Sequence, residues 1–588
     1  MGCFMSSSST IPKRVFKWAT ETPDSPAHYT LRDGEWRALS WAEYAGNVSL
    51  AGRALLSLGI GVGETIAILG FNCTEWVTLH VGAMAIGATP TGLYLTSSPD
   101  EIVYIVNHSK ASLIMVENQE CLEKVQRVRE QMPSLKHIVL IKGTPPDGVL
   151  DWDAFLAKGV DEEAGNSDFK DSLNSLDPDS AAERIYTSGT TGPPKAVVLT
   201  HANIEWSARA AVGFVGITKE DCSISYLPLS HVAEQVFTIT GPAVSGNAVY
   251  FAESFDNLVP NLLTSRPTIF FGVPRVWEKV HEGLSLRLSQ ATGIRLKLMQ
   301  WAMSVSRKAN RYQDRGIIWD PLLGMQYFIA KTLLKKRVKV PLGFDRLRLA
   351  FTGAAPIASD VADFFAGLDM PLHDAYGQTE SSGILTISLP RARKPGSVGR
   401  AIPGVELRIA DDGEILAKGS NVFVGYAENE EATKEALKNE WLATGDLGDL
   451  DDNGFLKITG RKKEIIITAG GENITPSLIE DAVKSSELVS EVCLVGDRKP
   501  YLVALITTNV DATTGLSNDA VHDALTKEID EVNLNFSRAH QIKKFAILPR
   551  QFTVEDGELT PTMKMKRSVI HEQFSEEIAT LYASDEKR

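Results

Sequence analysis

The sequence predicts an α/β fold with a large amino-terminal domain of mixed or largely parallel sheets and a small α+β carboxyl-terminal domain. The chain has 588 residues, more than one ordinary hydrophobic core accommodates, so several domains or subdomains are expected. Over residues 11–179, segments with helical apolar spacing alternate with short strand-like runs, as in sheets whose strands are mostly parallel. A composition shift near Gly460-Arg461-Lys462-Lys463 marks the start of the smaller unit.

Individual elements follow from this alternation. Glycines end a predicted helix at residue 58, and an acidic, serine-containing segment, residues 161–179, is expected to form a surface connection. The other predicted helices are residues 41–58, 76–86, 120–131, a long region over 275–340, 521–536 and 568–582. The predicted strands are residues 65–69, 112–116, 137–141, 223–229, 248–251, 494–495 and 502–506.

Composition narrows the class of protein. A formal net charge of −14 argues against nucleic-acid binding, which needs a basic surface, although a nucleotide site needs only local positive charge. The five cysteines show no CxxC spacing, so neither a disulfide framework nor a zinc site is indicated. The most apolar stretch, residues 81–95, is broken by Gly and Pro and falls short of the roughly 20 residues of a membrane span.

The two ends of the chain bear on localisation. Met1-Gly2-Cys3-Phe4-Met5-Ser6 fits the N-myristoylation pattern, and Cys3 is a candidate for palmitoylation; an unmodified, flexible tail over residues 1–10 is the alternative. The basic end of the long helical region, Lys331 to Lys339, fits either a solvated helix face or a patch on anionic lipid. We expect a cytoplasmic protein, peripherally bound to a membrane, without secretory or peroxisomal signal.

A phosphate-binding loop is predicted in Ile185-Tyr186-Thr187-Ser188-Gly189-Thr190-Thr191-Gly192-Pro193-Pro194-Lys195. Small hydroxyl residues and glycines leave backbone N–H groups free to wrap a polyphosphate, and Lys195 supplies a compact counter-charge. A P-loop needs a glycine before its lysine and a hydroxyl after it, whereas Pro194 and Ala196 stand there. A simple Gly/Thr hairpin turn is the remaining alternative.

Further polar motifs follow in the order a nucleotide site needs. An aromatic ring can lie on a purine, a threonine can bond a phosphate oxygen, and a carboxylate can hold Mg²⁺ or accept from ribose hydroxyls. Each motif alone is weak evidence for a nucleotide site, but their occurrence in this order along one chain is strong evidence. They are Thr352-Gly353-Ala354-Ala355-Pro356, Asp374-Ala375-Tyr376-Gly377-Gln378-Thr379-Glu380, Trp441-Leu442-Ala443-Thr444-Gly445-Asp446, Gly460-Arg461-Lys462-Lys463-Glu464 and Thr468-Ala469-Gly470-Gly471-Glu472-Asn473.

Together these motifs resemble the acyl-adenylate-forming superfamily from about residue 11 to the end of the chain. The resemblance implies the following roles. The phosphates would be held by Thr187, Ser188, Gly189, Thr190, Thr191, Gly192 and Lys195, and the α-phosphate would also contact Thr379. Adenine would lie at Tyr376, with Gly353, Asp374 and Gly377, and the ribose would bind Asp446 and Arg461. Mg²⁺ would bind Glu380 and Thr190, and the acyl carboxylate would lie near His231.

The resemblance also implies two domains and a moving hinge. Residues 11–460 would form the AMP- and acyl-binding domain, residues 461–463 the hinge at Lys463, and residues 464–588 a mobile domain. Lys564 matches the family's catalytic lysine, with Lys566 as the alternative, and Gly470 and Gly471 would face the pantetheine arm of CoA.

The branch of the superfamily is suggested by further runs. Phe271-Gly272-Val273-Pro274-Arg275, Ala469-Gly470-Gly471-Glu472-Asn473 and Gly70-Phe71-Asn72 look like long- and very-long-chain fatty acyl-CoA synthetases, most similar to the bubblegum type. That resemblance implies activation of a fatty acid with ATP, Mg²⁺ and CoA, through an acyl-AMP intermediate. Adenylation of a medium-chain or aryl acid, luciferase-like oxygenation, or a non-catalytic membrane-bound protein that binds fatty acid or nucleotide remain alternatives. Chain length and oligomeric state are not readable from these motifs.

Overall fold

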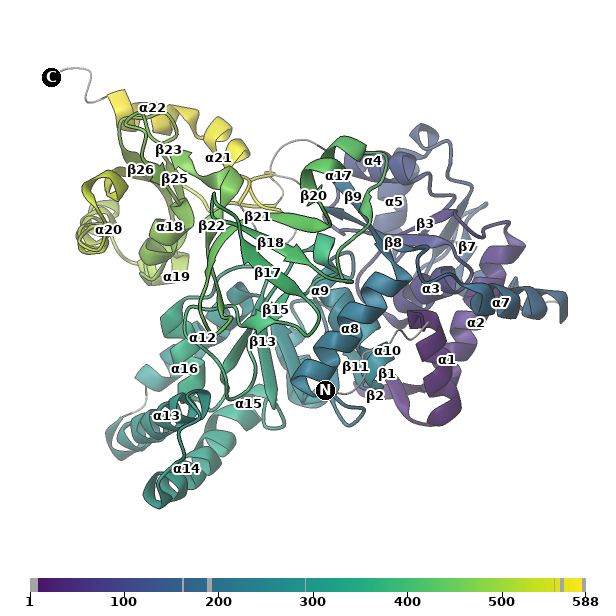
Figure 1. Ribbon diagram of the computed structural model, residues 1–588, viewed down its shortest axis with the longest axis horizontal. Coiled ribbons are helices and arrows are strands. Elements are labelled where there is room, and N and C mark those ends of the chain that lie inside the picture. The colour runs from purple at the N-terminus through teal and green to yellow at the C-terminus, as the bar shows by residue number, and fades with distance from the viewer. Residues whose placement is uncertain are drawn as a thin grey trace.

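Two lobes make up the chain in the computed structural model (Figure 1). The structure describes residues 9–160, 163–187, 193–290, 292–554, 556–560 and 565–583. The smaller lobe, which follows β22, holds β23 to β27 and α18 to α22 and stands apart at the upper left of the view. Its buried apolar clusters contain only residues from Ile466 onward, so it has a core of its own. The predicted two-domain α/β architecture is confirmed.

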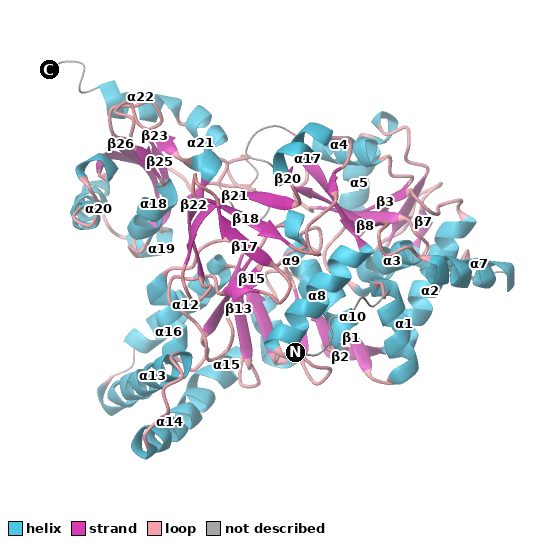
Figure 2. Cartoon of the chain, viewed as in Figure 1, coloured by secondary structure: helices cyan, strands magenta, loops and turns pink. Residues whose placement is uncertain are grey.

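An eight-stranded sheet forms the centre of one half of the large lobe. All five residues of its strand β3 are buried, and helices lie on both faces of the sheet, as the apolar, unalternating strand sequences require (Figure 2). Across the sheet the strands are β19 (Gly425–Tyr426), β9 (Lys195–Thr200), β8 (Ala181–Thr187), β4 (Thr89–Leu93), β3 (Thr65–Leu69), β5 (Leu113–Val116), β6 (His137–Leu140) and β7 (Leu150–Asp151). The helices of this part are α1 (Ile11–Glu21), α2 (Trp41–Ser57), α3 (Thr74–Ala85), α4 (Pro99–Ser109), α5 (Gln119–Arg127), α6 (Trp152–Ala157), α7 (Glu163–Ser175) and α8 (His201–Val215).

Two further sheets complete the framework behind the site. One has the order β10 (Cys222–Ser225), β11 (Ala248–Phe251), β1 (Pro26–Arg32) and β2 (Glu35–Ser40), and the other has the order β12 (Ile269–Gly272), β13 (Leu349–Gly353), β14 (Leu372–Tyr376), β15 (Thr386–Ile387) and β16 (Arg400–Ala401). The helices here are α9 (Val232–Gln235), the π-helix η2 (Val236–Thr240), α10 (Gly241–Ser245), α11 (Leu258–Ser265), α12 (Pro274–Ser289), α13 (Gly293–Asp314), α14 (Pro321–Leu334), the π-helix η3 (Lys335–Lys339), α15 (Val340–Leu342) and α16 (Ser359–Gly367).

A third group of strands connects the lobes. This sheet has the strand order β17 (Glu406–Ile409), β18 (Glu414–Lys418), β21 (Trp441–Leu450) and β20 (Leu437–Lys438), and β22 (Leu456–Arg461) also pairs with β21. Helix α17 (Glu430–Ala436) precedes β20, and the 3₁₀ turn η5 (Lys462–Glu464) follows β22. The small lobe contains β23 (Ile466–Ile467), β24 (Asn473–Ile474), β25 (Val489–Val495), β26 (Leu502–Thr508), β27 (Ile542–Ile547), α18 (Pro476–Lys484), α19 (Val510–Thr513), α20 (Asn518–Asn533), α21 (Arg567–Gln573) and α22 (Ser575–Ala583).

Two sequence-based expectations are corrected. Residues 161–179, expected as a surface connection, include helix α7, because Phe169 is buried and packs on Phe16 with ring centroids 5.8 Å apart. One apolar anchor thus folds a segment whose other residues are mostly polar. The single helix predicted over 568–582 is two helices, α21 and α22, which meet at Phe574.

Strand β4 lies directly beneath the loop that carries His231. A Cβ on Gly92 would sit 2.8 Å from the Cα atom of Ser230 and 3.1 Å from the ring of Trp76. Only glycine therefore allows the strand and this loop to approach so closely.

We predict that Gly92→Ala lowers the melting temperature, because overpacking of this kind costs about 1–3 kcal/mol. Gly46→Ala, in the interior of α2, is the matched control: its Cβ meets nothing within 4 Å, and it should stabilise by roughly 0.5–1 kcal/mol. Thermal unfolding followed by intrinsic fluorescence measures both. A Gly92→Ala protein that melts at or above the wild-type temperature would contradict the packing described.

Candidate functional site

A large cavity lies where the two lobes meet. Its volume is about 1670 Å³, larger than the roughly 300–1,000 Å³ of a typical small-molecule pocket, so it has room for more than one ligand. Both lobes contribute to its lining. Of the predicted site residues, Thr187, Lys195, His231, Gly353, Asp374, Tyr376, Gly377, Thr379, Glu380, Asp446, Arg461 and Lys463 line it.

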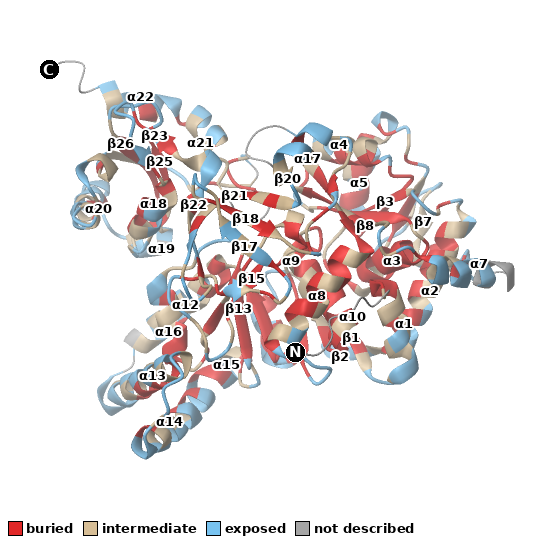
Figure 3. Cartoon of the chain, in the orientation of Figure 1, coloured by how far each residue is buried: buried red, intermediate tan, exposed pale blue. Residues whose placement is uncertain are grey.

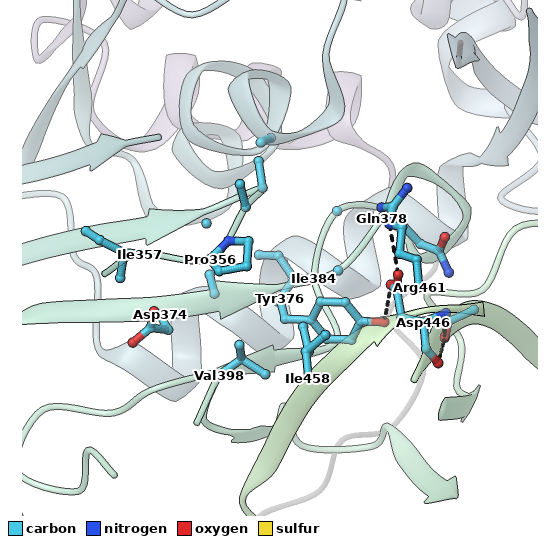
Figure 4. A pocket seen from close by; sticks show the side chains of 18 of the residues that line it. Pro356, Ile357, Asp374, Tyr376, Gln378, Ile384, Val398, Asp446, Ile458 and Arg461 are labelled. Carbon is cyan, nitrogen blue, oxygen red and sulfur yellow. Dashed lines mark hydrogen bonds and ion pairs between the residues drawn. The ribbon is translucent and has the colours of Figure 1, made fainter. Parts of the chain in front are cut away.

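Asp446 joins the two groups proposed to hold adenine and ribose. Its Oδ2 accepts a hydrogen bond of 2.8 Å from the Tyr376 hydroxyl, and its Oδ1 lies 3.1 Å from Nε of Arg461 (Figure 4). Burial raises the pKa of Tyr376 well above its ordinary value, so the hydroxyl remains a donor. Figure 4 shows the Tyr376 ring among the aliphatic side chains of Ile384 and Ile458. The ring and its apolar surroundings form a slot suited to a flat aromatic base.

Close backbone approach explains the glycines on either side of Tyr376. A Cβ on Gly353 would lie 2.5 Å from the carbonyl oxygen of Ala375, and one on Gly377 would lie 2.4 Å from that of Gly383. Any side chain at either position would push the strands apart. These glycines therefore set the shape of the slot.

Asp374 lies in the same wall of the cavity. Burial raises the pKa of Asp374 to about 6, and the guanidinium of Arg393 offsets part of the shift. Arg393 is itself paired with Asp314, whose Oδ2 lies 2.6 Å from the guanidinium. The carboxyl of Asp374 can thus act as a hydrogen-bond partner for a base amino group.

Tyr426 connects the predicted phosphate lysine with the predicted magnesium carboxylate. Its hydroxyl donates to Oε1 of Glu380 at 2.8 Å, and the ammonium of Lys195 lies 5.1 Å from the centre of its ring. Tyr426 belongs to β19, which pairs with β9, the strand that begins at Lys195. Sequence reasoning missed this residue, because a lone Gly-Tyr pair carries no signal of that pairing.

A buried polar network holds the loop that carries His231. The side-chain amide of Asn72 donates to Ser225 Oγ at 2.7 Å and to the carbonyl of Leu227 at 2.6 Å, and its oxygen accepts from the backbone N–H of Leu229 at 3.3 Å. Ser225 in turn donates to Glu234 at 2.6 Å. The role of Asn72 in this network had no sequence signal.

Glu234 is fully enclosed at the centre of this network. Burial raises the pKa of Glu234 to about 7, although the hydroxyls of Ser225 and Thr238 lower it in part. Thr238 donates to the same carboxylate oxygen at 2.7 Å. His231 caps the amino terminus of α9: its ring Nδ1 accepts from the backbone N–H of Ala233 at 3.2 Å, which holds the ring at the cavity wall.

One wall of the cavity is apolar. It is built from α8, from η2 and from neighbouring strands, and Phe237 stacks on Phe271 with ring centroids 4.8 Å apart. Its apolar residues include Ala208, Ala211, Val212, Val215, Val232, Val236, Phe237, Phe271 and Phe351. Such a wall suits the hydrocarbon part of a ligand.

Charges around Lys463 sort into two groups. Before it, Lys462 bonds to Asp412 at 2.6 Å and to Glu414 at 2.8 Å, both in the large lobe. After it, Glu464 lies 3.5 Å from Arg567, in the small lobe. The boundary between the two sets of ion pairs therefore falls at Lys463.

Some predicted site residues lie elsewhere. Gly470 and Gly471 occupy an exposed turn and do not line the cavity. Ser188, Gly189, Thr190, Thr191, Gly192 and Lys564 lie outside the described residues. Their described neighbours Thr187, Thr560, Met565 and Lys566 do line the cavity.

Sequence comparison assigns both parts of the chain to known protein families. Residues 15–427 match the AMP-binding enzyme family and residues 463–586 match the AMP-binding enzyme C-terminal domain. The chain is 37% identical to a long-chain-fatty-acid–CoA ligase ACSBG2 of Xenopus laevis, over 93% of this chain and 80% of that protein. It is 35% identical to the long-chain-fatty-acid–CoA ligase FadD15 of Mycobacterium tuberculosis, over 97% of this chain and 96% of that protein.

Solved structures of low sequence identity share the fold. An anthranilate CoA ligase in complex with anthranoyl-AMP matches with a TM-score of 0.75 at 20% identity, over 98% of this chain and 99% of that one. The adenylation domain of a carboxylic acid reductase from Segniliparus rugosus matches with a TM-score of 0.73 at 20% identity, over 99% and 95%. From its family match and its full-length relatives, the chain belongs to the AMP-binding enzyme family, in its long-chain-fatty-acid–CoA ligase branch.

Proposed function

We propose that this chain activates a long-chain or very-long-chain fatty acid to its CoA thioester through an acyl-AMP intermediate. The observation that carries the proposal is one cavity with a polar end around Asp446 and an apolar wall on α8 and η2. The named activity of the full-length relatives supports the same reaction. In the first half-reaction a carboxylate oxygen attacks the α-phosphorus of ATP and pyrophosphate leaves. In the second, the CoA sulfur attacks the acyl carbon and AMP leaves.

The polar end is proposed to hold the nucleotide. Adenine would lie against Tyr376, and the vicinal ribose hydroxyls would donate to Asp446, with Arg461 balancing its charge. Thr379 and Lys195 would contact the phosphates, together with residues 188–192. Because two anions must react, fixed donors and cations near phosphorus supply most of the rate enhancement.

Glu380 fits a role in holding Mg²⁺. Its carboxylate lines the cavity as a hard oxygen donor, and Tyr426 occupies only one of its oxygens. Within the described residues no group of three or more His, Cys, Asp or Glu could hold a metal alone, which fits an ion shared with substrate phosphates. When bound, Mg²⁺ would neutralise charge on the phosphates. Thr190 is proposed as its other protein contact.

The apolar wall is proposed to take the acyl chain. Its side chains come from α8, η2 and the strands that carry Phe271 and Phe351. His231 also lines the cavity, and we propose that it lies near the fatty carboxylate. His231 can donate a hydrogen bond there without acting as a nucleophile.

The small lobe is proposed to rotate about Lys463. Residues 11–460 would be one moving body, residues 461–463 the hinge and residues 464–588 the other. The change of ion-pair partners at Lys463 supports this division. With Thr560 and Lys566 at the cavity, the present pose suits adenylation by Lys564; a second pose would bring Gly470 and Gly471 toward CoA.

We also propose peripheral membrane contact. Within the described residues no helix is long and apolar enough to cross a bilayer. Gly2 and Cys3 are candidates for acylation, and Lys331 to Lys339 are candidates for contact with anionic lipid. One acyl chain binds a membrane only weakly, so a second contact would matter.

A substrate panel tests the proposed activity. Carboxylic acids of increasing chain length, with ATP, Mg²⁺ and CoA, should give pyrophosphate and acyl-CoA most efficiently for long chains, because each buried CH₂ adds about 0.8 kcal/mol. The measurement is kcat/KM for each acid. A preference for short or aromatic acids would contradict the long-chain assignment. If no acid is turned over, the proposal that the chain is an enzyme is wrong.

Lys564→Ala should separate the two half-reactions. We predict that it slows adenylate formation by about 10²–10³, comparable to removing one preorganised donor, while supplied acyl-AMP still reacts with CoA. Lys463→Pro should do the reverse, because a fixed φ restricts the hinge. Single-turnover assays of each half-reaction measure both variants.

Lys566→Ala is the matched control for that experiment, since Lys566 also lines the cavity. It should leave adenylation nearly unchanged. If Lys566→Ala instead shows the selective loss, the catalytic lysine is Lys566. Equal loss of both half-reactions in Lys564→Ala would mean that Lys564 is structural.

Gly2→Ala should shift part of the protein from membrane to soluble fractions of cells, because it removes the acceptor of the acyl chain but leaves the basic segment in place. Activity on detergent-dispersed substrate should stay unchanged. Metabolic labelling with a myristate analogue is the direct readout. Labelling of the Gly2→Ala protein, or none of the wild type, would contradict acylation at Gly2.

A further inference from the structure

The helical hairpin α13–α14 carries a charge opposite to that of the whole chain. Residues 291–340 contain eleven Lys and Arg against two Asp and no Glu, whereas the chain as a whole has a net charge of −14. The hairpin stands out from the large lobe at the lower left of Figure 1. A strongly basic projection on an acidic protein indicates an anionic partner.

Helix α14 is apolar on the outside as well as on the inside. Its inner face buries Leu323, Ala330 and Leu334, as expected for a helix packed on a core. Its outer face exposes four apolar side chains, and a helix that is apolar all round is normally buried. The exposed fractions are 60% for Leu322, 59% for Met325, 74% for Phe328 and 50% for Ile329.

These four residues form one stripe. Their spacing from Leu322 is three, six and seven positions, which places them within one side of the helix. Ile318, just before the helix, is 92% exposed and extends the apolar surface into the hairpin turn. Figure 3 shows exposed residues along both α13 and α14, interspersed with intermediate and buried ones.

The inner face is firmly attached to the large lobe, so the stripe belongs to a fixed surface. The Tyr327 hydroxyl donates to Asp369 at 2.5 Å, and Trp319 packs edge-on against Tyr327 with ring centroids 4.8 Å apart. Lys339, at the end of η3, bonds the same Asp369 at 2.9 Å. The stripe therefore lies on the side of α14 that faces away from these contacts.

Exposed cations flank the stripe at its carboxyl end. Lys331, Lys335, Lys336 and Arg337 are all exposed and follow directly on Ile329. A row of bulky apolar side chains beside Lys and Arg is typical of a helix that lies in the headgroup region of an anionic membrane. A nucleic acid would leave the four apolar side chains in water, and a second copy of this hairpin would bring like charges together.

We propose that the outer face of α14, from Ile318 to Ile329, docks into the headgroup region of an anionic lipid bilayer, with Lys331, Lys335, Lys336 and Arg337 on the lipid phosphates. The biological reason for such docking rests on the proposed function, since membranes hold long-chain fatty acids. The docking surface itself takes no part in catalysis. Arg311, Asp314 and Arg315, at the hairpin turn end of α13, line the cavity. Docking would therefore bring one rim of the cavity close to the lipid surface.

Vesicle co-sedimentation of the full-length Gly2→Ala protein tests the proposal without a contribution from an acyl chain. The protein should bind phosphatidylserine-rich vesicles and bind pure phosphatidylcholine vesicles several-fold less. Met325→Glu/Phe328→Glu should lower binding to the anionic vesicles by about tenfold or more, because it places two carboxylates at the lipid surface. Lys335→Glu/Lys336→Glu should lower it several-fold and weaken its dependence on salt.

Leu534→Glu is the matched control, because Leu534 is 84% exposed but lies in the small lobe. It should bind like the parent. The proposal would be overturned if Met325→Glu/Phe328→Glu bound anionic vesicles as well as the parent protein does. It would also be overturned if the parent formed a dimer that this variant disrupts while vesicle binding stays unchanged. Turnover of detergent-dispersed fatty acid, measured separately, distinguishes failure of the proposed enzyme activity from failure of membrane docking.

Discussion

The carboxylate of Asp446 is the constraint on which the site depends. One of its oxygens holds the hydroxyl of Tyr376 and the other holds Arg461, so a residue of β21 fixes both the base slot on β14 and the last residue of β22. The carboxylate is buried, and a buried charge is tolerated only with such partners. Loss of Arg461 would leave its charge uncompensated, and loss of the Tyr376 hydroxyl would remove a hydrogen bond from it.

Asp446 also places the proposed nucleotide site close to the proposed hinge. Arg461 is the last residue of β22, and the next two residues, Lys462 and Lys463, lead into the small lobe. Lys462 keeps its ion pairs in the large lobe, while Glu464 has its partner Arg567 in the small one. In our account, a nucleotide held at Asp446 would bind next to the strand that leads directly into the proposed hinge, in a cavity that the small lobe also lines.

Much of the fold could be predicted because its signals are local. The apolar strand β3 and the capped helix α2 follow from short stretches of sequence, and the order of the polar motifs indicated the site. What could not be predicted depends on contacts between distant segments. Tyr426 reaches the site only because β19 pairs with β9, and Asn72 holds a loop more than 150 residues away. The pose of the small lobe, which turns Lys566 toward the cavity and leaves Gly470 outside it, has no sequence signal either.

The most direct test of the role of Asp446 is a double-mutant cycle between the protein and its ligand. Calorimetry would compare a stable long-chain acyl-adenylate analogue with its 2′,3′-dideoxy form, on the wild type and on Asp446→Asn. If the ribose hydroxyls donate to Asp446, removing them should weaken wild-type binding roughly ten- to a hundredfold, as expected for hydrogen bonds to a charged group, and should weaken the variant far less. Equal losses on both proteins would contradict the account, because Asp446 would then hold Tyr376 and Arg461 without contacting the nucleotide.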